Sequence, residues 1–172
     1  MAIRHRSRHL RATMHNRLFD HLTLLGWIPT RLPDSSLTPV NFGADPIVVL
    51  DYQPDERGEI ITTNTVAVSI GDVINDVDEE LGAGLRSAWY PVFVDVYMAT
   101  QALSDAVCDD VRDIFDNQVF PLVNQIDQTD TDEQIEIDEV IGPDRPPAGG
   151  AADQFKRYWR VMRIGTRLYY RP

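Results

Sequence analysis

The sequence predicts a single α+β domain, residues 1–172, with a mostly antiparallel β-sheet packed by an N-terminal helix and a central helix. Three observations support this prediction. Apolar residues recur at three- and four-residue steps in two stretches, residues 10–25 and 103–114. The segments between and after them are rich in Val, Ile, Thr and aromatic residues, which favour strands. The resulting order (helix, two strands, strand, helix, two strands) favours hairpin-like neighbours over alternating parallel units.

Residues 1–26 are expected to form a basic amphipathic helix. The apolar side chains that would share one stripe are Leu10, Met14, Leu18, Leu22 and Leu25. Gly26 stands where a C-terminal cap belongs, and Pro29 cannot continue the helix. All four histidines of the chain lie in this segment. The face opposite the apolar stripe is expected to carry histidines and three arginines: Arg8, Arg11 and Arg17.

The core strands and the central helix are expected within residues 45–141. Strands are predicted at residues 47–50, 59–70 and 90–98, where β-branched and aromatic residues dominate. Residues 71–84 turn polar and acidic, which predicts a loop before the third strand.

The central helix should follow the third strand directly. Its apolar stripe comprises Leu103, Val107, Val111 and Ile114, with Cys108 and Phe115 at its flanks. Thr100 and Ser104 are both candidate N-caps, and Pro121 argues against a helix that continues beyond about residue 120. The outer face is expected to be acidic, with Asp109, Asp110, Asp113 and Asp116.

Two further strands are expected near the end of the chain. Residues 135–140 alternate apolar and charged side chains, which predicts a half-exposed strand after the acidic tract at 128–133. Residues 142–153 (GPDRPPAGGAAD) are predicted to form a flexible loop. Residues 154–172 are predicted to form the C-terminal strand. One face of that strand is expected to be basic and accessible, because arginines interleave with its aromatic and β-branched residues.

The charges are segregated along the chain. Residues 1–31 hold six arginines against one acid, and residues 156–172 hold one lysine and five arginines with no acid. Residues 32–155 hold 26 acids against four arginines, so the acidic middle outweighs both basic ends and the net charge is −11. The middle is expected to repel nucleic acid, whereas the ends suit an acidic partner or another copy of the chain. The other interpretation is a solubilising acidic surface with two cationic faces.

The sequence holds no recognisable catalytic, cofactor-binding or metal-binding motif. The sole lysine, Lys156, has no phosphate-loop context, and His5 with His9 has no third ligand for zinc. The only cysteine, Cys108, excludes an internal disulfide, and its expected position on the apolar side of a helix favours a structural role. Weak cation binding by the acids near Asp130 is an open alternative. We therefore expect no enzyme and no cofactor, and no apolar run is long enough to span a membrane.

Two stretches together resemble a known family. Residues 93–97 (FVDVY) followed by 106–114 (AVCDDVRDI) resemble the FVDVY … AEDVRD segment of small neck proteins of actinobacterial siphophages. Residues 155–161 (FKRYWRV) and the later Leu168-Tyr169-Tyr170 resemble the strand that closes the domain in those proteins. The likeness covers roughly residues 45–170, and the joint order of the motifs carries it. The arginine-rich N-terminal helix departs from the shorter acidic starts of that family.

These relatives are tail terminators, so the resemblance implies a structural virion protein that is assembled in the host cytoplasm. Its partners would be further copies of itself in a hexameric ring, the tail tube protein, and a head-side connector or head-closure protein. DNA would pass through the lumen without specific binding, because acidic side chains do not neutralise phosphates. Basic residues would contact acidic neighbouring subunits, with Arg157, Arg160 and Arg163 as candidates.

Two other function classes stay open. Another neck component, such as a head-closure or adaptor protein, would share the size, acidity and virion location but would contact the portal side. A nucleic-acid-binding module would use the N-terminal arginines, and its DNA binding would be sensitive to salt.

Overall fold

The computed structural model describes residues 6–30, 46–54, 61, 63–73, 75–77, 84–145 and 158–171. Its two helices are α1 (Arg6–Leu24) and α2 (Gln101–Phe115). The strands are β1 (Pro29–Thr30), β2 (Ile47–Leu50), β3 (Asn64–Ile70), β4 (Asn75–Val77), β5 (Arg86–Met98), β6 (Val119–Val123), β7 (Asp130–Asp144) and β8 (Tyr158–Tyr170). They form one eight-stranded sheet in the order β1-β2-β3-β5-β8-β7-β6, with β4 paired to β5 outside this path.

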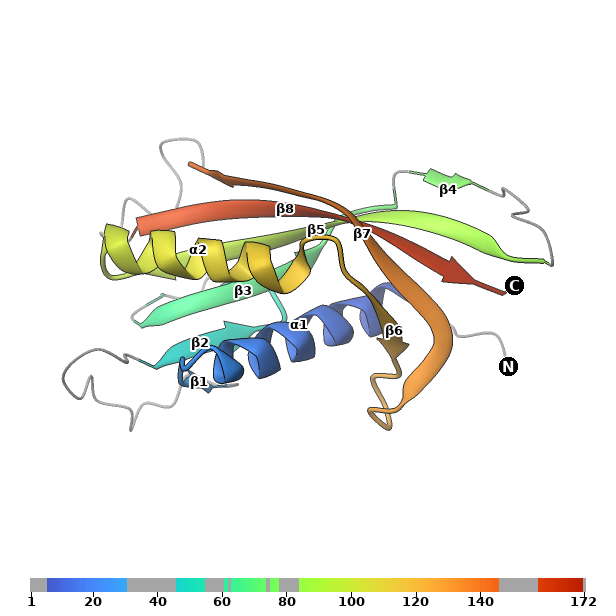
Figure 1. Ribbon diagram of the computed structural model, residues 1–172, viewed down its shortest axis with the longest axis horizontal. Helices are drawn as coiled ribbons and strands as arrows, with labels where there is room; N and C mark the ends of the chain where they lie inside the picture. Colours follow the sequence, from blue (N-terminus) through green and yellow to red (C-terminus); the bar gives the residue numbers. More distant parts are fainter. Residues whose placement is uncertain are drawn as a thin grey trace.

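The sheet is mostly antiparallel, which confirms the predicted α+β fold class. Only β1 with β2 and β2 with β3 run parallel among the described strands. Both helices pack on one face, and the sheet curls so that α1 contacts strands near both of its ends, β2 and β3 on one side and β6 on the other (Figure 1). The hydrophobic core fills the space between this curled sheet and the two helices.

Helix α1 is held in the curl by its apolar stripe. The side chains of Leu10, Met14, Leu18 and Leu22 are fully buried, and each contributes about 1.5–3 kcal/mol through its removal from water. Gly26 has a φ of +92°, and the backbone N–H of Trp27 donates to the carbonyl of Leu22, so the C-terminal cap lies where the sequence predicts it. Leu25 follows the last helical turn and is 52% exposed, so its predicted place in the buried stripe is wrong.

Polar groups of α1 also bond to both sides of the curled sheet. The Thr13 hydroxyl oxygen accepts the backbone N–H of Val123 on β6 at 2.9 Å. On the other side, Nε2 of His15 lies 2.9 Å from the carbonyl oxygen of Val49 on β2, and as a donor it satisfies that carbonyl. The helix therefore supplies hydrogen bonds that the neighbouring strand edges would otherwise seek elsewhere.

Helix α2 begins at the predicted cap and ends earlier than the sequence limit. The Thr100 hydroxyl accepts the backbone N–H of Leu103 at 3.2 Å, whereas Ser104 is buried inside the first turns, so Thr100 is the N-cap. The stripe of Val107, Val111 and Ile114 is buried as predicted.

Several strands differ from the sequence prediction in their presence or bounds. The predicted loop at 71–84 contains β4, and β6 arises where the sequence suggested only a helix limit at Pro121. An edge strand tolerates that proline because the missing N–H would face away from the ladder. Strand β7 extends from Asp130 to Asp144, and so takes in part of the acidic tract and the start of the predicted flexible loop. Pairing with β6 at its start and with β8 from Gln134 onward supplies the backbone hydrogen bonds whatever the side-chain polarity.

Candidate subunit or partner interface

The three predicted arginines of α1 do not share one role. Arg17 points back to the domain: its Nη2 donates to Oε1 of Gln118 at 2.9 Å, and its guanidinium lies 4.3 Å from the ring centroid of Phe120. Burial lowers the pKa of Arg17. A cation stacked on an aromatic ring and bonded within its own chain stabilises the fold and is not free to meet a partner.

Arg8 and Arg11 lie elsewhere on the same helix. Arg8 is exposed and Arg11 is half-exposed, and neither has a hydrogen bond or an ion pair with any residue that the structure describes. Three residues separate them, so they share a side of α1, whereas Arg17 is rotated away from Arg8 by about half a turn. These two arginines therefore keep the interface role that the sequence predicts for them.

The arginines of β8 divide between the two faces of the sheet. Arg160 is opposite Val96 of β5, on the face that the helices cover, and its Nη1 donates to the carbonyl of Trp159. Arg163 lies on the other face and pairs with Glu139 of β7 at 3.4 Å. Because a strand alternates its faces, these two arginines do not share one face of the sheet. Arg157 falls outside the described residues.

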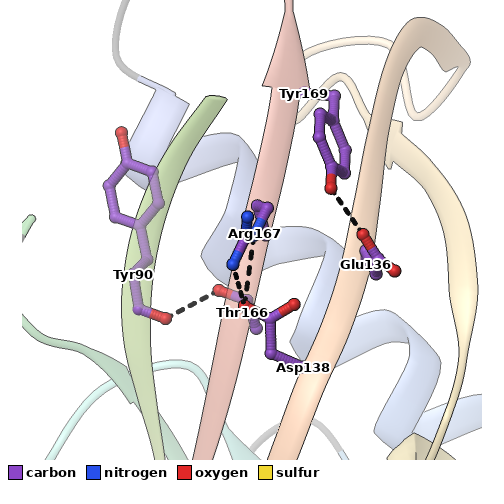
Figure 2. A network of polar contacts seen from close by, with 6 residues as sticks. All are labelled: Tyr90, Glu136, Asp138, Thr166, Arg167 and Tyr169. Carbon is purple, nitrogen blue, oxygen red and sulfur yellow. Dashed lines mark hydrogen bonds and ion pairs between the residues drawn. The ribbon is translucent and has the colours of Figure 1, made fainter. Parts of the chain in front are cut away.

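The face without helices, which we call the open face, carries cross-strand polar pairs between β7 and β8 (Figure 2). Arg167 binds the carboxylate of Asp138 at 3.2 Å, and the Tyr169 hydroxyl donates to Glu136 at 2.6 Å. The carboxylate of Asp138 raises the pKa of Arg167, and burial raises the pKa of Tyr169. These arginines are thus balanced by acids of the same chain, so the open face is a mixed-charge surface and not a basic one.

A bulge in β7 places those acids. Between Ile137 and Glu139 the register with β8 shifts by one residue, so Asp138 is the extra residue of the longer strand. Gly165 of β8 lies opposite Glu139, and a Cβ at this glycine would come within 2.8 Å of the Glu139 Cγ and 3.2 Å of the Trp89 ring. The glycine therefore lets both side chains cross the strand.

The predicted acidic outer face of α2 is confirmed, except that one predicted aspartate is engaged within the chain and a further aspartate belongs to the face. Four aspartates at successive helical steps are exposed, and none of their side chains has a hydrogen bond or an ion pair within the described part of the chain: Asp105, Asp109, Asp113 and Asp116. Asp110 instead accepts the indole N–H of Trp27 at 2.6 Å and so joins the end of α1 to α2. The sequence missed Asp105 as a member of the stripe, although its spacing of four from Asp109 indicates it.

Large apolar side chains are exposed at two places on the helix layer. Leu24, Leu25 and Ile28 are 79%, 52% and 52% exposed and follow one another at the end of α1. Ile126 is 90% exposed in the turn after β6, beside the first half of α1, where the N–H of Gln125 donates to Nδ1 of His9. Single exposed apolar residues are ordinary, but a contiguous group is typical of an interaction surface.

A buried carboxylate network on the open face was not found by sequence reasoning. Asp95 is 3% exposed and accepts the indole N–H of Trp159 at 2.8 Å and an amide N–H of Gln53. The Trp159 ring stacks on Tyr97 with centroids 5.4 Å apart. The sequence around Asp95 does not indicate its partners, because Trp159 and Gln53 lie in distant segments of the chain. The network fixes the start of β8 on β5.

Glu133 is a second buried acid, on β7 beneath the start of α1. Its Oε1 pairs with Arg6 at 3.4 Å, and Arg6 lies 3.8 Å from the centroid of the Tyr170 ring. The other oxygen, Oε2, is buried without a hydrogen-bond partner among the residues described. Burial raises the pKa of Glu133, and Arg6 opposes that rise.

Because its pKa is raised in the folded state, Glu133 is predicted to make the free energy of unfolding depend on pH. The folded protein binds the Glu133 proton more tightly than the unfolded chain, so the group's contribution is most favourable at low pH and is lost as the pH rises through the raised pKa. Glu133→Gln removes this titration. We expect the free energy of unfolding of the wild type, relative to E133Q, to fall as the pH rises from about 4.5 towards neutrality. Urea unfolding at several pH values measures this. The same trend for Glu139→Gln, whose carboxylate is exposed, would contradict burial as the cause.

The described residues contain no group of three or more His, Cys, Asp or Glu side chains that could hold a metal ion. Cys108 is buried in α2, and burial raises the pKa of its thiol to about 11, so at neutral pH it is a neutral packing residue. Neither helix combines the length and the apolar character that crossing a membrane requires, within the segments described.

Comparisons with known proteins add no family assignment. No protein-family model matches the chain, and a search of curated proteins finds no significant match. The functional proposal therefore rests on the geometry and on the sequence resemblance over residues 45–170.

Proposed function

We propose that this chain is a structural protein of a phage particle, a tail terminator that caps the tail tube and joins it to the head connector. In this role copies of the chain form a ring, expected to be hexameric, at the neck of the virion. The ring assembles in the host cytoplasm and presents one side to the tail tube protein and the other to a head-side connector or head-closure protein.

The observation that supports this proposal most is spatial. The two stretches that resemble terminators lie about sixty residues apart in the sequence, yet they form one contiguous unit: β5 pairs with β8 over 13 residues, and α2 packs against both strands. Two motifs that meet in one unit of sheet and helix make a more specific pattern than two strand motifs that lie apart. The unit of β5, β8 and α2 supports the proposal through its architecture, and the surface charge supports the role in a ring around DNA.

The surface charge suits a ring around DNA. Residues 32–155 hold 26 acids against four arginines, and such an acidic surface repels phosphates, so DNA would slide past it without sticking. A nucleic-acid-binding module is less favoured, because Arg6 and Arg17 are engaged within the chain and leave Arg8 and Arg11 as the cations of α1 without a partner in the described structure. Neutralising two phosphates gives weak binding at physiological salt.

Electron microscopy of lysates tests the proposal. A phage in which this gene is disabled is expected to give overlong, irregular tails and full heads without tails, because nothing stops polymerisation of the tube. Supplying the wild-type chain from a plasmid is expected to restore tails of normal length.

Two other outcomes would overturn the terminator role. Tails of normal length beside unattached heads would move the protein to the head side of the neck, as a head-closure or adaptor protein. Normal particles would show that it is no neck component. Salt-sensitive retention of DNA by the purified chain, lost in R8E/R11E, would then favour the nucleic-acid-binding alternative.

A further inference from the structure

We propose that copies of this chain contact one another head to tail through two different surfaces of the helix layer. The acidic surface consists of Asp109 and Asp113 on α2 with the apolar group at the end of α1. The basic surface consists of Arg8 and Arg11 on α1. The inference deepens the proposed function: it rests on self-assembly, and it names the side chains that join one subunit to the next.

The acidic surface combines charge with exposed apolar area. Asp109 and Asp113 lie one helical turn apart and point away from the core, since Val107 and Val111 on the opposite side are buried. The hydrogen bond from Trp27 to Asp110 joins the end of α1 to this helix, so Leu24, Leu25 and Ile28 adjoin the aspartates. An apolar centre with charges beside it is the usual anatomy of a protein–protein interface.

The basic surface lies at the other end of α1. Arg8 and Arg11 precede Leu24 by 16 and 13 residues, which corresponds to about 20–24 Å along the helix axis. Arg8 is exposed and Arg11 is half-exposed, and neither side chain has a polar contact with the described residues. The two cations give this part of α1 the opposite charge to the acidic surface.

The two surfaces are complementary in charge to each other, but neither is complementary to a second copy of itself. On the acidic surface the aspartates outnumber the nearby exposed Arg112, so two copies of this surface repel each other, and the same holds for two copies of the arginine pair. Contact is therefore favourable only between the acidic surface of one copy and the basic surface of the next. Such heterologous contacts build rings or filaments and exclude a symmetric dimer through either surface.

Charge reversal in the full-length chain tests the pairing. We expect D109K/D113K and R8E/R11E each to weaken self-association about tenfold or more, measured by sedimentation velocity over a range of concentrations at low salt. All four positions are at the surface, so the urea midpoints should stay close to that of the wild type. Asp72→Lys, an exposed change far from both surfaces in the sequence, is the control and should leave association unchanged.

Mixing gives the sharper result. D109K/D113K carries two positive surfaces and R8E/R11E carries two negative ones, so each should fail alone while an equimolar mixture should assemble with the two variants alternating. The quadruple variant, with both surfaces reversed, should also assemble. A loss of folding cannot produce recovery on mixing, so this outcome separates the pairing from damage to the domain.

Three results would overturn the inference: a wild-type chain that stays monomeric at every concentration, association that charge reversal leaves unchanged, or no recovery in the mixture. The phage experiment is independent of these. Recovery on mixing together with normal tails in the gene-disabled phage would keep the contact and reject the terminator role. Overlong tails together with no recovery would keep the role and reject the contact.

Discussion

Replacing Leu18 with alanine is expected to lower the free energy of unfolding by about 2–5 kcal/mol, the usual cost of truncating a fully buried leucine. The Leu18 side chain has no exposed area and belongs to the core cluster that joins α1 to the sheet. Because α1 contacts strands at both sides of the curled sheet, little of the surrounding structure can collapse into the cavity. Urea unfolding followed by tryptophan fluorescence measures the change.

Arg8→Ala on the same helix is the matched control. Its side chain is exposed and has no polar contact with the described residues, so the change should stay within about 0.5 kcal/mol. An effect of Leu18→Ala as small as that of Arg8→Ala would contradict the burial of the Leu18 stripe. Loss of stability in both would instead mean that Arg8 contributes to the fold, and its interface role would then fail.

The helices could be predicted in detail because their signals are local. The four-residue spacing of Leu10, Met14, Leu18 and Leu22 identifies the buried side of α1 without knowledge of its partner, and Thr100 marks the start of α2 through its own hydroxyl. Leu25 shows the limit of this reasoning. The periodicity includes it, but Gly26 ends the helix and turns Leu25 to solvent.

The strands were harder, because pairing supplies what composition does not show. Asp130 to Asp144 reads as an acidic tract, a short strand and the start of a Pro-rich loop, yet it is one strand, paired with β6 at its start and with β8 from Gln134 onward. The bulge at Asp138 interrupts the simple alternation that sequence reasoning relies on. The length of β7 is thus set by its neighbour, and a single sequence carries no direct record of that neighbour.

The candidate interface was predicted by charge alone, and charge does not tell which arginines are already engaged. Arg17 and Arg163 meet Gln118 and Glu139, whose partnerships depend on how distant segments come together. Arg8 and Arg11 differ from Arg17 by a rotation about the helix axis, which the sequence contains but which a whole-segment count of arginines hides. The structure therefore adds what the sequence lacks, because it distinguishes arginines that are bound within the chain from those whose side chains have no described partner.

Gly142→Ala is expected to destabilise the protein by roughly 2–5 kcal/mol, through backbone strain and a clash together. Gly142 has a φ of +106°, a conformation that residues with a Cβ rarely adopt. An added Cβ would lie 2.8 Å from the carbonyl oxygen of Val161 and 3.1 Å from the backbone nitrogen of Asp144. Both contacts are with backbone of the paired strands, which cannot move aside as the end of a flexible side chain can.

Gly26→Ala separates the two causes. Gly26 also has a positive φ, +92°, but a Cβ there would meet no atom within 4 Å, so this substitution carries the conformational cost alone, about 1 kcal/mol. Urea unfolding of both variants is expected to show Gly142→Ala as the more destabilising by at least about 1 kcal/mol. Equal losses would mean that β7 yields at residue 142, so that the clash contributes nothing. The carbonyl of Gly142 also accepts a hydrogen bond from Arg112 of α2, so yielding there would shift the acidic helix that we place in the subunit contact.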